Sequence, residues 1–175
     1  LITAVGGDQL GKQLLDHTAA CGGDVSACIR VENQATSCYL AVYNHEGVPQ
    51  TALDDMRVLD ALTPTVIREL KSQIQQAALL FVDANLQPAT LKMIFQLACK
   101  AGVPVCADTT SRILAARLEP YLNDLYMLMA NRSEVTVINR DTPEVTGRFT
   151  ALQAVRQLVN RGVDFAVIPL AEFGV

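Results

Sequence analysis

The chain has 175 residues, half of them hydrophobic, which is enough for one domain with a substantial core. Its formal net charge of -4 and the absence of a Lys/Arg-rich run argue against nucleic acid and anionic membranes as partners. Apolar runs such as 77–82 are far shorter than the ~20 residues of a membrane span, and no signal segment opens the chain. We therefore expect a cytoplasmic protein that acts on small molecules.

The cysteines indicate neither a disulfide framework nor a zinc site. There are five of them, an odd number, and none forms a Cys-x-x-Cys pair. We expect them to be buried, reduced thiols.

The chain begins with an apolar run at 1–5 that predicts a strand. A helix is expected over 9–20, with Leu10 and Leu14 along one face and Gly22-Gly23 at its end. The connecting segment Gly6-Gly7-Asp8-Gln9-Leu10-Gly11 has neither the G-x-G-x-x-G spacing nor the Walker ending. It therefore predicts a tight turn rather than a phosphate cradle.

The next segment is rich in short β-type runs. Strands are predicted at 28–31, 37–43 and 48–52, the last two joined by the turn 44–47. Two or three antiparallel strands inserted in an α/β chain form a flap. Such a small sheet cannot bury both of its faces alone, so it needs the main domain or a partner subunit.

From residue 62 onward helices and strands alternate. Thr63 and Pro64 predict the start of a helix that runs to about 75, and the continuous apolar run 77–82 predicts a strand buried on both faces. Pro88 opens a helix that ends at Gly102. The remaining predictions are strand 103–107, helix 111–118, strand 125–129, helix 151–161 and strand 165–168. This alternation indicates an α/β fold with a mainly parallel sheet flanked by helices.

Polar loops follow these strands, where parallel sheets bind ligands. They are Asp83-Ala84-Asn85, Asp108-Thr109-Thr110-Ser111, Asn131-Arg132-Ser133-Glu134 and Pro169-Leu170-Ala171-Glu172-Phe173-Gly174. The amide of Asn131 and the carboxylate of Glu134 either meet around a hydrated Mg²⁺ or form the capping box of a helix. Ser111 is expected to cap the next helix, whereas for Asp83 and Asn85 ligand contact and turn formation both stay open.

Four motifs resemble the ribokinase-like, or PfkB, carbohydrate kinase family over almost the whole chain. They are Val5-Gly6-Gly7-Asp8-Gln9-Leu10-Gly11, 35–42 with Gly47, Asp108-Thr109-Thr110-Ser111, and Asn131-Arg132-Ser133-Glu134. Asp54-Asp55-Met56-Arg57-Val58-Leu59, Leu62-Thr63-Pro64 and Val82-Asp83-Ala84-Asn85-Leu86 are most similar to the pseudouridine kinase branch. The resemblance implies ATP-dependent phosphorylation of a sugar or nucleoside hydroxyl, and a ribokinase-like α/β fold with a β-lid that often mediates homodimers.

The resemblance also implies a division of the chain and a set of site residues. Residues 1–27 begin the α/β core, 28–52 form the β-lid, and 53–175 continue the core. Expected contacts with the sugar or nucleoside are Asn85, Ser37, Tyr39 and Asp55. Expected contacts with ATP are Asp108, Asn131, Glu134 and Gly174, with Asn131 and Glu134 organising Mg²⁺. Transfer is expected to be in-line, with the protein supplying positioning and charge neutralisation.

The sequence departs from the family pattern in several places. An early Gly-Gly and Asn sugar-binding motif would precede Leu1, and the Gly-Ala-Gly-Asp motif with the base would follow Val175, so we expect a fragment. The pattern Thr-x-Gly-x-x-Gly is altered at 169–174, and Ala130 replaces a common proline. Two hypotheses therefore stay open: a sugar or nucleoside kinase, or a non-catalytic kinase-like regulator that binds a sugar or nucleoside.

Overall fold

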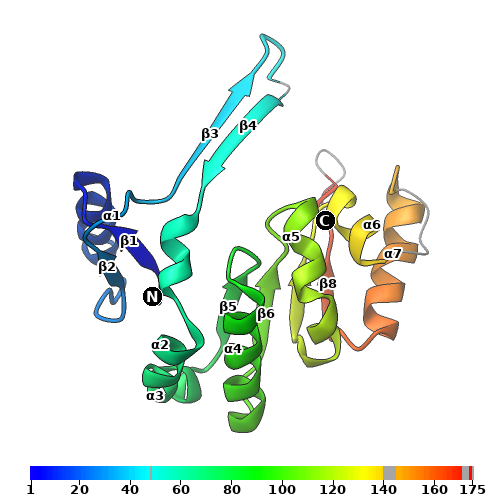
Figure 1. The fold of residues 1–175 in the computed structure, drawn as a ribbon. Helices are drawn as coiled ribbons and strands as arrows, with labels where there is room; N and C mark the ends of the chain where they lie inside the picture. The colour runs from blue at the N-terminus through cyan, green and yellow to red at the C-terminus, as the bar shows by residue number, and fades with distance from the viewer. Residues whose placement is uncertain (48, 140–144, 171–173, 175) are drawn as a thin grey trace. The chain divides into compact units, whose positions relative to one another are not determined.

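The structure is a computed structural model that describes residues 1–47, 49–139, 145–170 and 174. The chain divides into two compact units, Leu1–Val66 and Ile67–Val175, and each is described by itself (Figure 1). None of the helices in these ranges is both long enough and apolar enough to cross a membrane.

Unit 1 is built on a β-α-β element. β1 (Ala4–Gly6) lies parallel to β2 (Ile29–Val31), and α1 (Gln9–Ala20) connects them over the range predicted from the sequence. The 3-10 helix η1 (Arg57–Ala61) packs against both strands. Leu10 and Leu14, predicted along one face of α1, are 58% and 50% exposed, and the buried residue of α1 is Gly11.

Asp8 fixes the turn between β1 and α1. Its carboxylate accepts hydrogen bonds from the Gly11 amide at 2.8 Å and from the Thr36 amide at 2.8 Å and hydroxyl at 2.5 Å. These bonds, chiefly that of the Thr36 hydroxyl, lower the pKa of Asp8 to about 2. A single carboxylate thus caps the helix and ties the turn to a segment 28 residues away.

The glycines of this turn are required by close packing. A Cβ on Gly6 would lie 2.4 Å from the Gln34 carbonyl oxygen, and one on Gly7 would lie 2.6 Å from the Cα of Glu32. The turn therefore lies directly against the backbone of a neighbouring segment. Close packing therefore accounts for the two glycines of the predicted turn.

The flap is an antiparallel hairpin that protrudes from the rest of unit 1 (Figure 1). β3 (Cys38–Tyr43) pairs with β4 (Pro49–Asp55), and Leu40 lies opposite Leu53. Leu40 and Leu53 on one face are 61% and 69% exposed, and Tyr39 on the other is 64% exposed. The expectation that 28–31 belongs to this antiparallel flap is wrong, because β2 pairs with β1.

Unit 2 contains a four-stranded parallel sheet in which strand order follows chain order, β5-β6-β7-β8. α2 (Pro64–Glu69) spans the boundary between the two units. The other elements are α3 (Lys71–Gln76), β5 (Leu80–Asp83), α4 (Pro88–Ala101), β6 (Val105–Asp108), α5 (Arg112–Ala115), the 3-10 helix η2 (Ala116–Asp124), β7 (Met127–Met129), α6 (Arg132–Ile138), α7 (Arg148–Asn160) and β8 (Phe165–Val167). The predicted α/β alternation is therefore confirmed.

Two predicted helices are shorter than expected. The helix from Pro64 stops at Glu69, and a separate helix starts after Leu70, which has non-helical backbone angles. The helix after Ser111 becomes a 3-10 helix at Ala116, and this contains Pro120, which has no N–H to donate. The predicted caps at Ser111 and Gly102 are confirmed, with Gly102 at a left-handed φ of 69°.

The two faces of the unit 2 sheet differ in burial. Right-handed crossovers between strands in this order place all connecting helices on one face. Val82, Ala107 and Leu128 form a row across the sheet and are 7%, 0% and 0% exposed. Phe81 and Phe165, from the opposite row, are 57% and 55% exposed. The predicted burial of both faces of the first strand is therefore wrong, because Phe81 is more than half exposed.

All five cysteines are free thiols. Only Cys106 is buried, whereas Cys28 is half-buried and Cys21, Cys38 and Cys99 are exposed. The expectation that the cysteines are buried is therefore wrong for most of them. Burial raises the pKa of the Cys106 thiol.

Candidate functional site

The carboxyl ends of the parallel strands form one polar edge of unit 2, which we call the rim. It consists of the loops after β5, β6, β7 and β8. Asp83 pairs in register with Asp108, and Asp108 with Met129. The Ala84 amide donates to the Asp108 carbonyl at 3.2 Å, and the Thr109 amide donates to the Met129 carbonyl at 3.1 Å. Successive loops are thus hydrogen-bonded to one another, in the crevice position where such sheets bind ligands.

Asn131 and Glu134 form a capping box at the start of α6. Asn131 Oδ1 accepts from the amides of Ser133 at 2.9 Å and Glu134 at 3.0 Å. In return, the Glu134 carboxylate accepts from the Asn131 amide at 2.9 Å and from Asn131 Nδ2 at 2.6 Å. Of the two uses weighed for this pair, the helix cap is the one present in the structure.

Glu134 also joins two loops of the rim. Its side chain is buried, with 6% exposure, and its carboxylate accepts a third hydrogen bond from the Thr109 hydroxyl at 2.5 Å. Thr109 itself is fully buried. A buried carboxylate needs such donors to compensate for its lost hydration. Glu134 therefore fixes the loop after β6 against the loop after β7.

The rim offers no preformed metal cage. Among the described residues, no three or more His, Cys, Asp or Glu side chains lie close enough to hold an ion. Asp83 Oδ1 accepts a hydrogen bond from the Asn85 amide at 2.8 Å, and Asp108 Oδ1 accepts one from the Thr110 amide at 2.7 Å. Mg²⁺ commonly binds through one or two carboxylates, several waters and substrate phosphates. The donor set would suit that mode, in which Asp83 or Asp108 would share the ion with a phosphorylated ligand.

Thr110 has an unusual backbone conformation within the rim. Its φ is 63°, a left-handed value that a β-branched residue rarely adopts. Its amide donates to Asp108 Oδ1, and its hydroxyl accepts from the Ala84 amide at 3.1 Å. Such strained residues persist where the surroundings hold them, and they cluster at functional sites.

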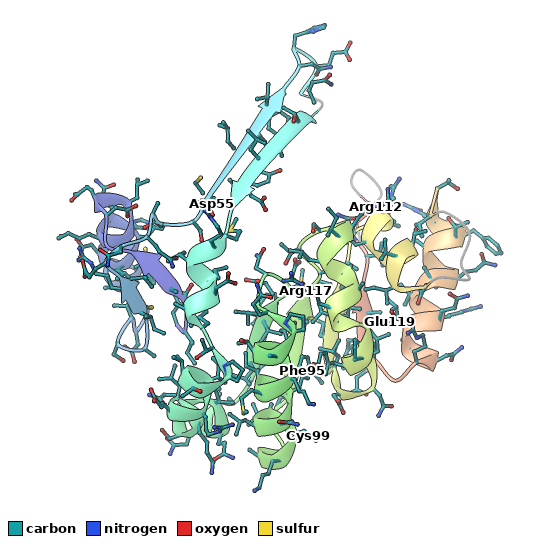
Figure 2. All side chains as sticks on the ribbon, in the orientation of Figure 1. Asp55, Phe95, Cys99, Arg112, Arg117 and Glu119 are labelled. Atoms are coloured by element: carbon teal, nitrogen blue, oxygen red, sulfur yellow. The ribbon has the colours of Figure 1, made fainter. Side chains whose placement is uncertain are left out.

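Arg117 holds the loop that carries Asn85. Its side chain belongs to η2 (Figure 2). The Nη1 atom donates to three consecutive carbonyls, those of Ala84 at 3.1 Å, Asn85 at 3.0 Å and Leu86 at 3.1 Å. We call these three hydrogen bonds the Arg117 clasp. The side chain of Asn85 is partly exposed beside it. Sequence reasoning missed Arg117, because a lone arginine at a helical position carries no signal of its backbone partners.

A pocket of about 480 Å³ lies between the loops after β6 and β7. Its lining residues are Arg112, Arg132, Ser133, Thr136 and Val145. Arg132 Nη2 donates to the Leu170 carbonyl at 2.9 Å, which brings the loop after β8 to the same place. The sequence placed Arg132 inside a recognised motif, but gave no sign that Arg112 would line the same pocket.

Gly174 is the part of the predicted nucleotide loop that the structure describes, together with Pro169 and Leu170. It is exposed with a left-handed φ of 84°, and its carbonyl accepts from the Leu170 amide at 2.6 Å. Ala171, Glu172 and Phe173 lie outside the described residues. Contact of Gly174 with a nucleotide stays a prediction.

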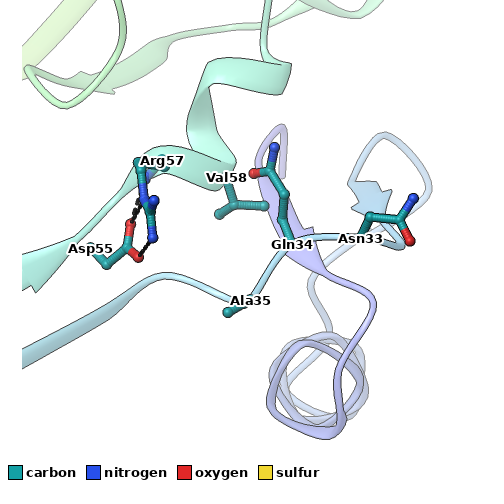
Figure 3. Close-up of a pocket in the computed structure, with 6 residues that line it drawn as sticks. All are labelled: Asn33, Gln34, Ala35, Asp55, Arg57 and Val58. Atoms are coloured by element: carbon teal, nitrogen blue, oxygen red, sulfur yellow. Dashed lines mark hydrogen bonds and ion pairs between the residues drawn. The ribbon is translucent and has the colours of Figure 1, made fainter.

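Unit 1 contains a second pocket, of about 260 Å³, lined by Asn33, Gln34, Ala35, Asp55, Arg57 and Val58 (Figure 3). Arg57 Nε and Nη2 donate to the two oxygens of Asp55 at 2.9 Å and 2.6 Å. This hydrogen-bonded ion pair lowers the pKa of Asp55 to about 2. The pocket therefore presents an ionised carboxylate beside a guanidinium, flanked by two amide side chains.

The other two predicted substrate residues of unit 1 do not line this pocket. Ser37 Oγ is buried, and it has no hydrogen-bond partner among the residues that the structure describes. Tyr39 lies on the exposed hairpin. Their contact with a substrate stays a prediction.

Comparison with known proteins identifies related sequences over the whole chain. Residues 1–175 match the family described as pfkB family carbohydrate kinase. "Uncharacterized sugar kinase YeiI" of Escherichia coli (strain K12) is 30% identical over 158 residues, which cover 90% of this chain and 43% of that protein. "Pseudouridine kinase" of the same organism is 28% identical over 175 residues, which cover 100% of this chain and 55% of that protein. The chain thus spans about half the length of these curated relatives.

Solved structures share the fold. A carbohydrate kinase from Agrobacterium tumefaciens superimposes with a TM-score of 0.76 and 23% identity, covering 95% of this chain and 52% of that one. Ribokinase from Giardia lamblia gives a TM-score of 0.77 at 15% identity, covering 97% and 52%. The ribokinase-like α/β fold predicted from the sequence is confirmed, and the chain belongs to the PfkB family of carbohydrate kinases, a family of phosphotransferases.

Proposed function

We propose that the full-length protein carrying this chain is an ATP-dependent kinase of the cytoplasm that phosphorylates a hydroxyl group of a sugar or nucleoside. The observation that carries the proposal is the match of all 175 residues to a kinase family. The rim supports it, because its loops gather acidic, amide and arginine side chains at one edge of a parallel sheet.

In this proposal the rim is the ATP side of the enzyme. Asp108, Asn131, Glu134 and Gly174 belong to it. Asn131 and Glu134 act by fixing the loop geometry through their capping box, and Mg²⁺ would bind beside them with the nucleotide. The ion, when bound, neutralises phosphate charge. We assign no residue of this chain as the general base.

The residues predicted to contact a sugar or nucleoside are proposed to bind the phosphoryl acceptor. Asp55 is the best supported of them, because its ionised carboxylate lines the pocket of unit 1. A carboxylate is a suitable acceptor for the hydroxyl groups of a sugar or ribose. Asn85, Ser37 and Tyr39 are proposed as further contacts.

Pseudouridine is the substrate we propose to test first. It is named for a relative that matches the chain over its full length. A second relative, "Guanosine-inosine kinase" of Exiguobacterium acetylicum, is 22% identical over 173 residues. Both names point to nucleosides, whereas YeiI is named as a sugar kinase.

We also propose that the β3–β4 hairpin mediates a homodimer. Its two strands pair only with each other in the described sheet, and apolar side chains on both faces are more than half exposed. A two-stranded hairpin of this kind is marginally stable without further packing. A second copy of the same hairpin would cover one of these faces.

The test is an ATP-consumption assay on the full-length protein with Mg²⁺ and a panel of sugars and nucleosides that includes pseudouridine. We expect turnover with one acceptor class. Asp55→Asn is expected to raise the KM for that acceptor, whereas the exposed neighbour Asp54 provides the control Asp54→Asn. No turnover with any acceptor, despite measurable acceptor binding, would overturn the kinase proposal.

A non-catalytic binding protein is the second candidate. The altered loop favours it, because Pro169 and Ala171 replace a hydroxyl residue and a glycine of the family's nucleotide pattern. In that case a sugar or nucleoside would bind while ATP would neither bind nor be consumed. Calorimetric titration with each ligand separates the two candidates.

A further inference from the structure

Two neighbouring loops of the rim each place an arginine at the first residue of the next helix. Arg112 follows the cap Ser111, and Arg132 follows the cap Asn131. β6 and β7 are adjacent in the sheet, and α5 packs against α6. Both arginines consequently line the same pocket of about 480 Å³.

Among the residues that the structure describes, neither guanidinium group has a carboxylate partner. Arg132 donates to a neutral carbonyl, that of Leu170, and the side chain of Arg112 makes no hydrogen bond or ion pair with a described residue. Elsewhere in the chain Arg57 is paired with Asp55 and Arg161 with Glu119. Two unneutralised cations that share a pocket repel each other, so a bound anion there would be stabilised by both.

The remaining lining groups do not compete for the arginines. The Ser133 hydroxyl donates to Asn131 Oδ1, and the Thr136 hydroxyl donates to the Arg132 carbonyl. The nearby carboxylate of Glu134 is buried and already accepts three hydrogen bonds. The free donors of the pocket are therefore guanidinium N–H groups, whose planar fork suits phosphate oxygens.

We propose that Arg112 and Arg132 together bind the phosphate chain of a nucleoside triphosphate in this pocket. The volume lies within the range of small-molecule sites, and an oligophosphate has the negative charge that two arginines require. The identity of the ligand rests on the proposed kinase function, whereas the anion site rests on the geometry. Arg112, absent from the motifs recognised in the sequence, becomes a donor-binding residue.

The test uses calorimetric titration of sodium tripolyphosphate into the 175-residue chain at low salt without Mg²⁺. We expect Arg112→Gln and Arg132→Gln each to weaken binding about tenfold and the double variant to abolish it. Arg156→Gln is the control, because Arg156 is exposed on α7 and its substitution removes the same charge outside the pocket. Arg112→Gln is the decisive variant, since it breaks no described bond.

Three results would overturn the inference: no tripolyphosphate binding by the unaltered chain, unchanged binding by Arg112→Gln, or equal weakening by Arg156→Gln. The same variants in the full-length protein separate this inference from the kinase proposal. Acceptor phosphorylation with an unchanged KM for ATP in Arg112→Gln refutes the arginine site alone. Tripolyphosphate binding that depends on both arginines, without turnover of any acceptor, refutes the kinase proposal alone.

Discussion

Replacing Glu134 by glutamine tests whether this residue acts first as a structural joint of the rim. In the unaltered chain its carboxylate accepts from the Asn131 amide, Asn131 Nδ2 and the Thr109 hydroxyl. A glutamine has one oxygen and one NH₂ group in the same place. Whichever way the amide is oriented, its NH₂ faces at least one of these donors, so at least one bond is lost.

The expected cost follows from these contacts. A hydrogen bond to a buried charged group contributes about 1.5–3 kcal/mol, and the bonds that survive become neutral and weaker. At 6% exposure, solvent compensates little for the lost bond. We therefore expect Glu134→Gln to lower the free energy of unfolding by about 2–4 kcal/mol, a large fraction of the about 5–15 kcal/mol typical of a domain.

Urea unfolding followed by far-ultraviolet circular dichroism, with EDTA present, measures this change. Glu69→Gln on α2 is the matched control, because Glu69 is exposed and its substitution is expected to change stability by less than about 0.5 kcal/mol. A residue that acts only as a Mg²⁺ ligand would show no loss without the ion. If the free energies of unfolding of Glu134→Gln and the unaltered chain differ by less than about 0.5 kcal/mol, Glu134 does not hold the two loops together as described.

Three further predictions concern other fixed points of the two units. The pKa of Asp8 falls from 3.8 to about 2 on folding, so its contribution to stability is complete above pH 3.8 and is lost as the pH falls through about 2. Thermal unfolding measured over this pH range should therefore depend less on pH in Asp8→Asn than in the unaltered chain. Gly6→Ala should destabilise unit 1 by more than about 1 kcal/mol, because the new Cβ would meet backbone atoms at 2.4 Å, whereas Gly147→Ala, with open space, should not. Arg117→Met should speed hydrogen exchange in the loop 84–86, and unchanged exchange there would exclude the clasp.

Local chemistry explains what the sequence predicted well. Ser111 caps a helix and Gly102 ends one, as predicted, because each residue type satisfies backbone groups within its own turn. The parallel sheet followed from the alternation of helices and strands, which requires no knowledge of distant contacts. The gathering of four polar loops at one edge followed in turn from the sheet topology.

Long-range contacts explain what the sequence could not predict. The exposure of Phe81 depends on which sheet face the helices cover, and an apolar run does not encode this. The role of Arg117 depends on three carbonyls more than thirty positions earlier in the chain. For Asn131 and Glu134, spacing allowed both a cap and a metal site, and only the distances between their atoms identified the cap.

The hydrogen bonds between the loops have a mechanical consequence. Ala84 is bonded to the segment after β6, Thr109 and Glu134 bond that segment to the next, and Ala130 donates to the Val167 carbonyl at 3.1 Å. The four strand ends are thus coupled in series. A ligand that displaces any one of them must carry its neighbours along or break a link, so events at one end of the series are transmitted to the other.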